Sequence, residues 1–193
     1  MYRSIILSFL LLPVLLFAQT NSKTALLLID IQDFYFPGGR SALFEPDAAA
    51  NQAALLLKDF RSKNQLIIHV KHQAELGADI HMLVKPFDNE KVITKKQVNS
   101  FKDTDLLDYL KENQIDTLVM AGMQTHMCLE AAVRAAHDFG FICLLIEDAC
   151  ATKDLNYNGH TIAAKDVHLS TLHTLRAYSK IYTTSEFLNT IKH

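Results

Sequence analysis

Three side chains able to do chemistry follow three predicted strands of the chain. Asp30 closes the first apolar segment, Lys95 directly follows a short later one, and Cys128 lies just beyond another, at the expected start of a helix. The N-terminus of a helix stabilises a thiolate through its dipole and its free N–H groups. A carboxylate beside the thiol can take its proton and return it to a leaving amine, and an ammonium keeps such a pair charged in an apolar pocket. These residue types predict hydrolysis by a thiol nucleophile, with backbone N–H groups near Cys128 as an oxyanion hole.

Each of the three residues also has an ordinary structural explanation. An aspartate at the end of a strand often forms a turn or caps a helix, and a lysine in a Lys95-Lys96 pair is usually solvated. A single cysteine early in a helix is most often a small core residue. The chemistry depends on all three lying at one edge of a sheet.

The elements that would position these residues alternate between strands and helices. Thr24–Ile31 is a continuous apolar run, which is typical of a strand buried on both faces. Alternation of this kind predicts an α/β fold, a three-layer α/β/α arrangement with a mostly parallel, Rossmann-like sheet of five or six strands. The carboxyl ends of parallel strands share one edge, where ligands bind. We expect strands at 24–31, 65–70, 91–94, 116–121, 141–146 and 180–183, helices at 46–62, 103–113, 125–139, 161–179 and 185–191, and long loops at 72–90 and 153–159.

The composition is that of one globular domain. The chain has 193 residues, about half of them apolar, and a mean hydropathy of +0.08. Its 19 Lys and Arg against 21 Asp and Glu give a formal charge of −2. This charge balance does not favour nucleic acid as a partner.

Residues 1–18 have the pattern of a signal peptide. Arg3 precedes an apolar block that ends at Ala18 and gives way to polar residues. At 1.5 Å per residue the block is short for a membrane span. We expect cleavage, a single mature domain at 19–193, no membrane span thereafter, and a periplasmic or extracellular location. An uncleaved anchor and a buried first helix are the alternatives.

The three cysteines do not predict a disulfide framework. Their odd number leaves at least one free thiol. Cys143 lies in an apolar strand and Cys150 lies seven residues further on, so an extended chain places their Cα atoms about 20 Å apart. A disulfide needs less than about 7 Å, and we expect none between them.

Four blocks, in order, resemble the signature blocks of the isochorismatase-like cysteine hydrolases. They are DIQDFYFPGG (30–39), VITKKQVNSF (92–101), AGMQTHMCLEAAVRAA (121–136) and EDACAT (147–152), followed by Val167-His168. The resemblance covers 24–187 and implies the same fold. It also implies a catalytic triad of Asp30, Lys95 and Cys128, where the spacing of the second block selects Lys95 over Lys96.

The resemblance further implies a cis peptide bond between Met123 and Gln124, and an oxyanion hole from the backbone N–H groups of Gln124 and Cys128. Members of the family that keep the cysteine are amidases, including nicotinamidases, whereas those that hydrolyse isochorismate generally lack it. Because this chain keeps Cys128, the resemblance implies cleavage of a C–N bond in a small molecule through a thioester. It implies no cofactor, and a homo-oligomer that is a dimer or a tetramer.

The chain departs from the nicotinamidase pattern in its histidines. The Asp-x-His pair that holds a metal there is absent here. A site built from His69, His72 and His81 is an alternative, but we expect isolated, hydrogen-bonded histidines and no metal.

Four further residues are candidates for contact with the substrate. Tyr35 and Phe101 would wall a small planar substrate, unless they belong to the core. His126 would face the cleft or cap the start of the helix, and Gln32 would fix a loop or touch the ligand. His168 is expected at a subunit contact or at the cleft rim, and Asp148 is expected to cap the turn after its strand.

Two other functions remain open from the sequence. One is hydrolysis of an ether or ester of a chorismate-like acid, which would need several cationic groups in the pocket. The other is a non-hydrolytic redox protein, in which Cys128 has a low pKa and pairs with Cys143 or Cys150 as a resolving thiol.

Overall fold

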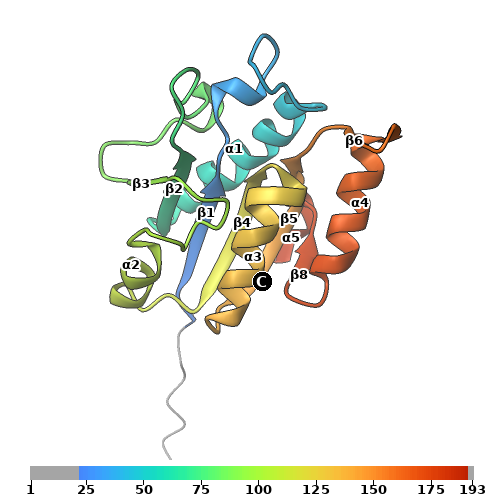
Figure 1. The fold of residues 1–193 in the computed structure, drawn as a ribbon. Coiled ribbons are helices and arrows are strands. Elements are labelled where there is room, and N and C mark those ends of the chain that lie inside the picture. The colour runs from blue at the N-terminus through green and yellow to red at the C-terminus, as the bar shows by residue number, and fades with distance from the viewer. Residues whose placement is uncertain (1–21, 191–193) are drawn as a thin grey trace, which may run out of the picture.

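A computed structural model describes residues 22–190, and the signal peptide predicted for 1–18 lies outside this range. The described part contains a parallel six-stranded sheet of order β3-β2-β1-β4-β5-β8, shown in Figure 1. Its strands are β1 (Thr24–Ile29), β2 (Leu66–His72), β3 (Lys91–Lys95), β4 (Thr117–Met123), β5 (Ile142–Ala151) and β8 (Lys180–Tyr182). The predicted parallel sheet is confirmed.

Helices cover both faces of the sheet (Figure 1). Apolar side chains of α1 (Pro46–Ser62) and α5 (Thr184–Thr190) pack on one face. Those of α2 (Leu106–Glu112), α3 (Glu130–Asp138) and α4 (Ala164–Leu175) pack on the other. The three-layer α/β/α architecture is therefore confirmed. No helix among residues 22–190 is long and apolar enough to cross a membrane.

Strand β1 shows why an unbroken apolar run forms the centre of such a sheet. Leu26 and Leu28 belong to the core on the side of α1, whereas Ala25, Leu27 and Ile29 belong to the core on the side of α3. Because successive side chains of a strand point to opposite faces, a strand between two helical layers must be apolar at every position.

Strands β1 and β4 approach each other closely at Gly122. A Cβ atom at this position would lie 2.0 Å from the carbonyl oxygen of Ile29, and the φ angle of Gly122 is 140°. Only glycine fits such a backbone. The register of β4 against β5 also shifts between Met120 and Gly122, which brings the end of β4 into its position at the carboxyl edge.

The structure corrects five of the expected assignments. Strand β5 continues to Ala151, past the predicted end at 146, and the loop predicted at 153–159 is part of a hairpin of β6 (Leu155–Tyr157) and β7 (His160–Ile162). The hairpin takes residues assigned to the next helix, so α4 begins at Ala164. The helix expected from 125 opens with a wide π turn, η3 (Thr125–Leu129). A short 3-10 turn, η2 (Met82–Val84), interrupts the expected loop 72–90.

The predicted absence of a bond between Cys143 and Cys150 is confirmed. Both lie on β5 as free, buried thiols. Asp148, on the same strand, accepts hydrogen bonds at 2.8 Å from the backbone N–H and the hydroxyl of Thr184, the first residue of α5. It caps a helix that is distant in sequence rather than the turn after its own strand.

A buried ionic cluster fastens α1 to β2 through Glu90, the residue before β3. The Glu90 carboxylate contacts Arg61 Nε at 2.7 Å and His69 Nε2 at 3.0 Å, and accepts the N–H of Phe87 at 2.9 Å. Although burial opposes ionisation, the hydrogen bonds from Arg61, Phe87 and His69 lower the pKa of Glu90 to about 2. The folded state therefore favours the carboxylate.

We expect Glu90→Gln to lower the free energy of unfolding at pH 7 by about 2–3 kcal/mol. Since the pKa of Glu90 is lower in the folded state, this stability is present above its ordinary value of 4.5 and disappears as the pH falls toward 2. Urea unfolding at several pH values should show the loss in wild type and not in the variant. Asp59→Asn, in the exposed Lys63–Asp59 pair of α1, should cost less than about 1 kcal/mol. Equal effects of the two substitutions would contradict this account.

Candidate active site

Three strand ends meet where the order of the sheet reverses. The chain runs from β1 outward through β2 to β3, and then returns to add β4 on the other side of β1. Open parallel sheets bind ligands at such a reversal, outside the carboxyl ends of the strands. Asp30 follows β1, Lys95 ends β3, and Cys128 lies in the turn after β4.

The structure brings Asp30, Lys95 and Cys128 into contact. Lys95 Nζ lies 2.7 Å from Asp30 Oδ2 and 3.2 Å from Cys128 Sγ, and both charged side chains are fully buried. Lys95 Nζ also donates to the carbonyl oxygen of Gln97 at 3.1 Å and lies 3.2 Å from His72 Nδ1. Lys96, the competing lysine, is exposed.

Burial keeps Cys128 in its thiol form. Desolvation, together with the nearby Asp30 carboxylate, raises the pKa of Cys128 to about 12, and Lys95 only partly opposes this. Burial also raises the pKa of Asp30 above its ordinary 3.8, against the pull of Lys95. Burial thus opposes the thiolate that the start of a helix would stabilise, and the resting site favours the neutral thiol.

The arrangement of donor atoms does not suit a metal ion. Asp30, His72 and Cys128 each place one ligand atom within 4.8 Å of the others. However, Lys95 Nζ contacts all three at 2.7–3.2 Å, so an ammonium already holds the position that a cation would take. A positive charge there repels a divalent ion.

The three histidines weighed as a metal set are dispersed. His69 is buried against Glu90, and His81 stacks on Phe36 with ring centroids 3.5 Å apart while its Nδ1 accepts the N–H of Leu83. His72 alone contacts the triad. The first two histidines therefore have structural partners, in line with the expectation of isolated, hydrogen-bonded side chains.

The turn that carries Cys128 has the backbone shape expected of it. The peptide bond between Met123 and Gln124 is cis. The carbonyl oxygen of Gln124 accepts the N–H groups of Met127 and Leu129, at 3.0 and 3.3 Å, which gives the turn its wide π shape. The oxyanion hole expected from the N–H groups of Gln124 and Cys128 would form in this turn.

Tyr35 lies beside this turn. Its hydroxyl accepts a hydrogen bond from Gln124 Nε2 at 3.2 Å. Burial, and the charge of Asp30, raise the pKa of Tyr35 to about 12. A neutral phenol that accepts one hydrogen bond still has its own proton to donate, so Tyr35 is suited to contact a substrate.

Gln32 fixes the wall of the site. Its amide accepts the N–H of His72 at 2.7 Å, and donates to the carbonyl oxygens of His72 at 3.0 Å and Ala78 at 2.7 Å. These bonds tie the segment after β1 to the end of β2 and to the loop beyond it. Of the two roles expected for Gln32, the geometry favours fixing the loop.

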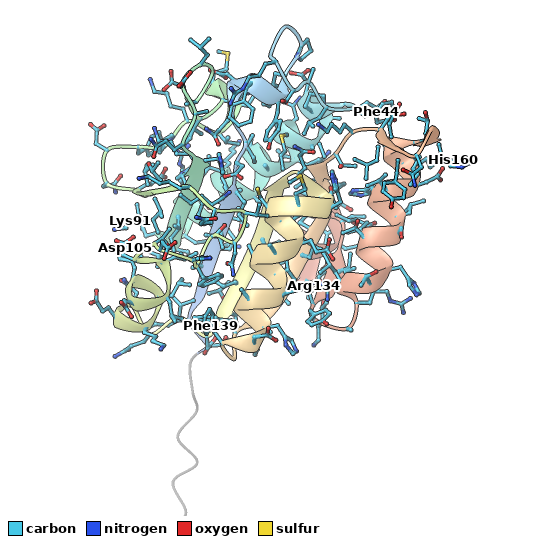
Figure 2. The ribbon with its side chains drawn as sticks, in the orientation of Figure 1. Phe44, Lys91, Asp105, Arg134, Phe139 and His160 are labelled. Atoms are coloured by element: carbon cyan, nitrogen blue, oxygen red, sulfur yellow. The ribbon has the colours of Figure 1, made fainter. Side chains whose placement is uncertain are left out.

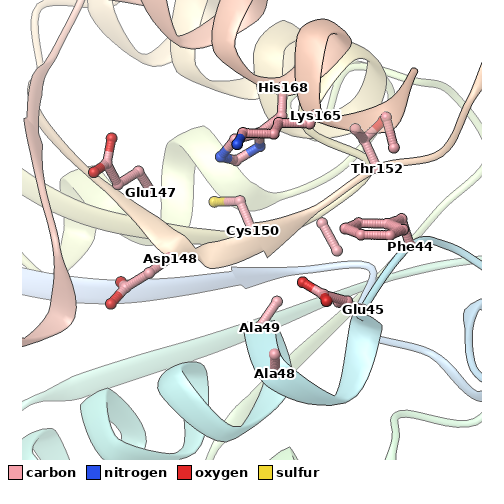
Figure 3. A pocket seen from close by; sticks show the side chains of 12 residues that line it. Phe44, Glu45, Ala48, Ala49, Glu147, Asp148, Cys150, Thr152, Lys165 and His168 are labelled. Carbon is pink, nitrogen blue, oxygen red and sulfur yellow. The ribbon is translucent and has the colours of Figure 1, made fainter. Parts of the chain in front are cut away.

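His126 and His168 take part in hydrogen bonds that connect the turn carrying Cys128 to the end of β5 and to α4. His126 Nδ1 lies 2.6 Å from Thr152 Oγ1, and Thr125 Oγ1 lies 3.0 Å from His168 Nδ1. Thr152 and His168 line a cavity of about 540 Å³ between α1, β5 and α4, shown in Figure 3 with Cys150 and Phe44 on its walls. His126 therefore makes a structural hydrogen bond to the residue that follows β5, and His168 is one of the residues that line this cavity.

Phe101 does not lie with the other candidates. Its ring centroid is 5.3 Å from that of Phe139 and 6.3 Å from that of Phe141. Phe139 follows the C-terminus of α3, at the edge of the molecule opposite the carboxyl ends of the strands (Figure 2). The proposed wall formed by Phe101 is therefore not supported, because its ring fills the core between α3 and the sheet.

Comparison with known proteins agrees with this geometry. The family model described as the isochorismatase domain matches residues 24–177. The chain belongs to the isochorismatase family. The uncharacterized isochorismatase family protein YddQ of Bacillus subtilis (strain 168) is 41% identical over 86% of this chain and 98% of its own length. A crystal structure from Oleispira antarctica, assigned to the isochorismatase hydrolases, superposes with a TM-score of 0.83 at 40% identity and covers 88% of this chain and 98% of that one.

Two more distant relatives of this isochorismatase-family chain have named activities. A streptothricin hydrolase of Streptomyces noursei is 31% identical over 72% of this chain and 58% of its own length. The maleamate amidohydrolase of Pseudomonas putida is 28% identical over 65% of this chain and 71% of its own length. The chain is accordingly a hydrolase of this family, which includes amidohydrolases.

Sequence reasoning missed one residue of the site and one cation whose charge reaches it. His72 was weighed only as a metal ligand, although the parallel register places it directly opposite Lys95. Arg40, in the loop after Tyr35, is an exposed cation whose charge reaches both Tyr35 and His72. The register of β2 against β3 could have indicated His72, whereas nothing in the local sequence distinguishes Arg40.

Proposed function

We propose that the protein is a cysteine hydrolase that cleaves an amide C–N bond of a small molecule, with Asp30, Lys95 and Cys128 as its catalytic residues. The observation that carries this proposal is the buried contact of one ammonium with both a carboxylate and a thiol. The named activities of the amidohydrolase relatives support the choice of an amide.

The first half of the proposed reaction forms a thioester. Asp30 takes the proton of Cys128, and the resulting thiolate attacks the carbonyl carbon of the substrate. Lys95, already in contact with the sulfur and the carboxylate, stabilises the negative charge wherever it resides. The backbone N–H groups of Gln124 and Cys128 receive the oxyanion. As the C–N bond breaks, Asp30 returns its proton to the leaving nitrogen.

The second half releases the acid. Asp30, again a carboxylate, takes a proton from a water molecule that attacks the thioester carbon. The C–S bond then breaks and the proton returns to the sulfur. The products are ammonia or an amine, and a carboxylic acid, and the enzyme recovers its starting protonation.

The two alternatives fit the site less well. A redox sensor needs an accessible thiolate, but the pKa of Cys128 is raised to about 12 and Cys143 and Cys150 are both buried. A chorismate-like acid needs several cations, but Lys95 pairs with Asp30, and within residues 22–190 Arg40 is the cation whose charge acts on both Tyr35 and His72.

The experiment is ammonia release from a panel of small primary amides and ureido acids, by protein starting at residue 19. Wild type and Cys143→Ala, which removes a buried thiol far from the triad in sequence, should release ammonia equally. Mass spectrometry of rapidly acid-quenched samples should find the acyl group on Cys128. Ammonia release with no acyl group on Cys128, or the absence of turnover on every amide, would refute the proposal.

We also propose that the chain is exported, that the mature protein begins near residue 19, and that it forms a homo-oligomer. The support for export is the charge and apolar pattern of residues 1–18, and the support for oligomerisation is the family resemblance. N-terminal sequencing of the protein from the periplasm or medium, followed by light scattering of that material, tests both. An intact Met1 would refute cleavage, and a monomer mass would refute assembly.

A further inference from the structure

His72 is a side chain that contacts Lys95 and that the proposed reaction does not use. It ends β2, directly opposite Lys95 in the parallel register, and its Nδ1 lies 3.2 Å from Lys95 Nζ. The two hydrogen bonds between its backbone and the amide of Gln32 fix the position of this residue. The imidazole is therefore held from its backbone and from one ring nitrogen.

The contact with Lys95 favours one tautomer of the ring. An ammonium only donates hydrogen bonds, so the contact is favourable when His72 Nδ1 accepts, and on that ground we assign the proton of the neutral imidazole to Nε2. The charged groups that face His72 are Lys95, Asp30 and Arg40, with Cys128 Sγ close by. Burial, and then Lys95, lower the pKa of His72 below its ordinary 6.5, which agrees with a neutral ring.

The opposite side of the ring is available to a ligand. Among residues 22–190, no atom forms a hydrogen bond with His72 Nε2. This nitrogen is also not one of the polar atoms that are fully buried without a partner, so solvent reaches it. The ring is only partly buried. Among the described residues, Nε2 is thus left without a protein partner, and the charge of Arg40 acts on this ring as it does on Tyr35.

We propose that His72 orients the substrate through its Nε2–H and positions Lys95 through its Nδ1. The substrate that fits carries an oxygen acceptor, a carbonyl or carboxylate oxygen, beside the amide to be cleaved. This inference rests on the proposed amidase activity and names a feature of its substrate. His72 takes no part in the covalent steps, and its neutral form is the one that the site uses.

Two substitutions separate the two roles of the ring. His72→Asn retains a polar atom near the position of Nδ1 and removes the outward donor, so KM for the best amide of the panel should rise about 10-fold with kcat nearly unchanged. His72→Gln places its amide near the position of Nε2 and removes the acceptor for Lys95, so kcat should fall about 10-fold with a smaller change in KM. The control is His137→Asn, an exposed histidine on α3, which should change neither.

The pH profile gives a readout that a purely structural role would not alter. The wild-type site needs Asp30 ionised and His72 neutral, so log(kcat/KM) should fall toward acid pH with a slope that approaches 2. In His72→Asn only Asp30 titrates, and the slope should be 1. Equal slopes, or equal loss of kcat and KM in both variants together with lowered melting temperatures, would overturn the proposal.

An experiment that needs no substrate turnover distinguishes failure of this inference from failure of the proposed function. Iodoacetamide carries a primary amide and alkylates thiolates, so its reaction with Cys128 can be followed by mass spectrometry even if no amide of the panel is hydrolysed. We expect alkylation of Cys128 to be about 10-fold slower in His72→Gln and unchanged in His137→Asn. Unchanged rates in His72→Gln would overturn the positioning role, whatever the panel shows.

Discussion

Cys128→Ala should lower kcat for every amide by at least about 10³-fold while leaving the fold intact. The thiol is the group that forms a covalent bond to the substrate in the proposed reaction. Its side chain is small and 6% exposed, so alanine fits the same space. Steady-state ammonia release and a thermal melt should show lost kcat with a melting temperature close to that of wild type.

Cys128→Ser provides the sharper comparison. A hydroxyl is smaller and far less acidic than a thiol, and Asp30 cannot ionise it to a useful extent. We expect the serine variant to bind substrate, and to retain about 10⁻³ or less of the wild-type kcat. Substantial activity in either variant would mean that another group, or a water molecule, performs the attack.

Lys95→Met should lower the free energy of unfolding by about 3–5 kcal/mol, and it should also abolish the amidase activity. The substitution leaves the buried Asp30 carboxylate without its cation at 2.7 Å. An uncompensated charge in an apolar site takes up a proton, so Asp30 would become neutral and could no longer accept the proton of Cys128. Urea unfolding and ammonia release should both detect the change.

The double variant Asp30→Asn/Lys95→Met separates the two effects. It removes both charges together, so stability should recover to within about 1–2 kcal/mol of wild type. Activity should not recover, because the base and the cation are both absent. A double variant that is as unstable as Lys95→Met alone would show that the packing of the lysine stem, rather than its charge, stabilises the site.

The sequence was sufficient to predict the groups at the edge of the sheet. An apolar run that ends in Asp30 predicts a central parallel strand and the side on which its carboxylate emerges, and the same reasoning placed Lys95 and Cys128 at that edge. Their contact, at 2.7 and 3.2 Å from one nitrogen, follows from the reversal of strand order between β1 and β4.

The protonation of the site could not be read from the sequence. The position of Cys128 at the start of a helix suggested a thiolate, but burial dominates the pKa of this thiol. That burial depends on how the helices and the sheet pack around the turn after β4, which the local sequence does not show. Phe101 was misplaced for a related reason, because the chain after Lys95 descends to α2 and carries the ring away from the site. The hairpin of β6 and β7 was missed because a loop of polar residues and glycine does not reveal its own pairing.

The strand order of the sheet determines how long the cationic side chain at position 95 must be. Lys95 projects from β3, and β2 lies between β3 and β1, so the side chains of Lys95 and Asp30 must together span two strand spacings, about 10 Å, to meet. The stem of the lysine passes over the end of β2, which explains why His72 touches it. A histidine or a shortened amine at position 95 would not reach across β2. The reach of the lysine is therefore dictated by strand order, and any redesign that moved the cation to β2 would need a shorter side chain for the same chemistry.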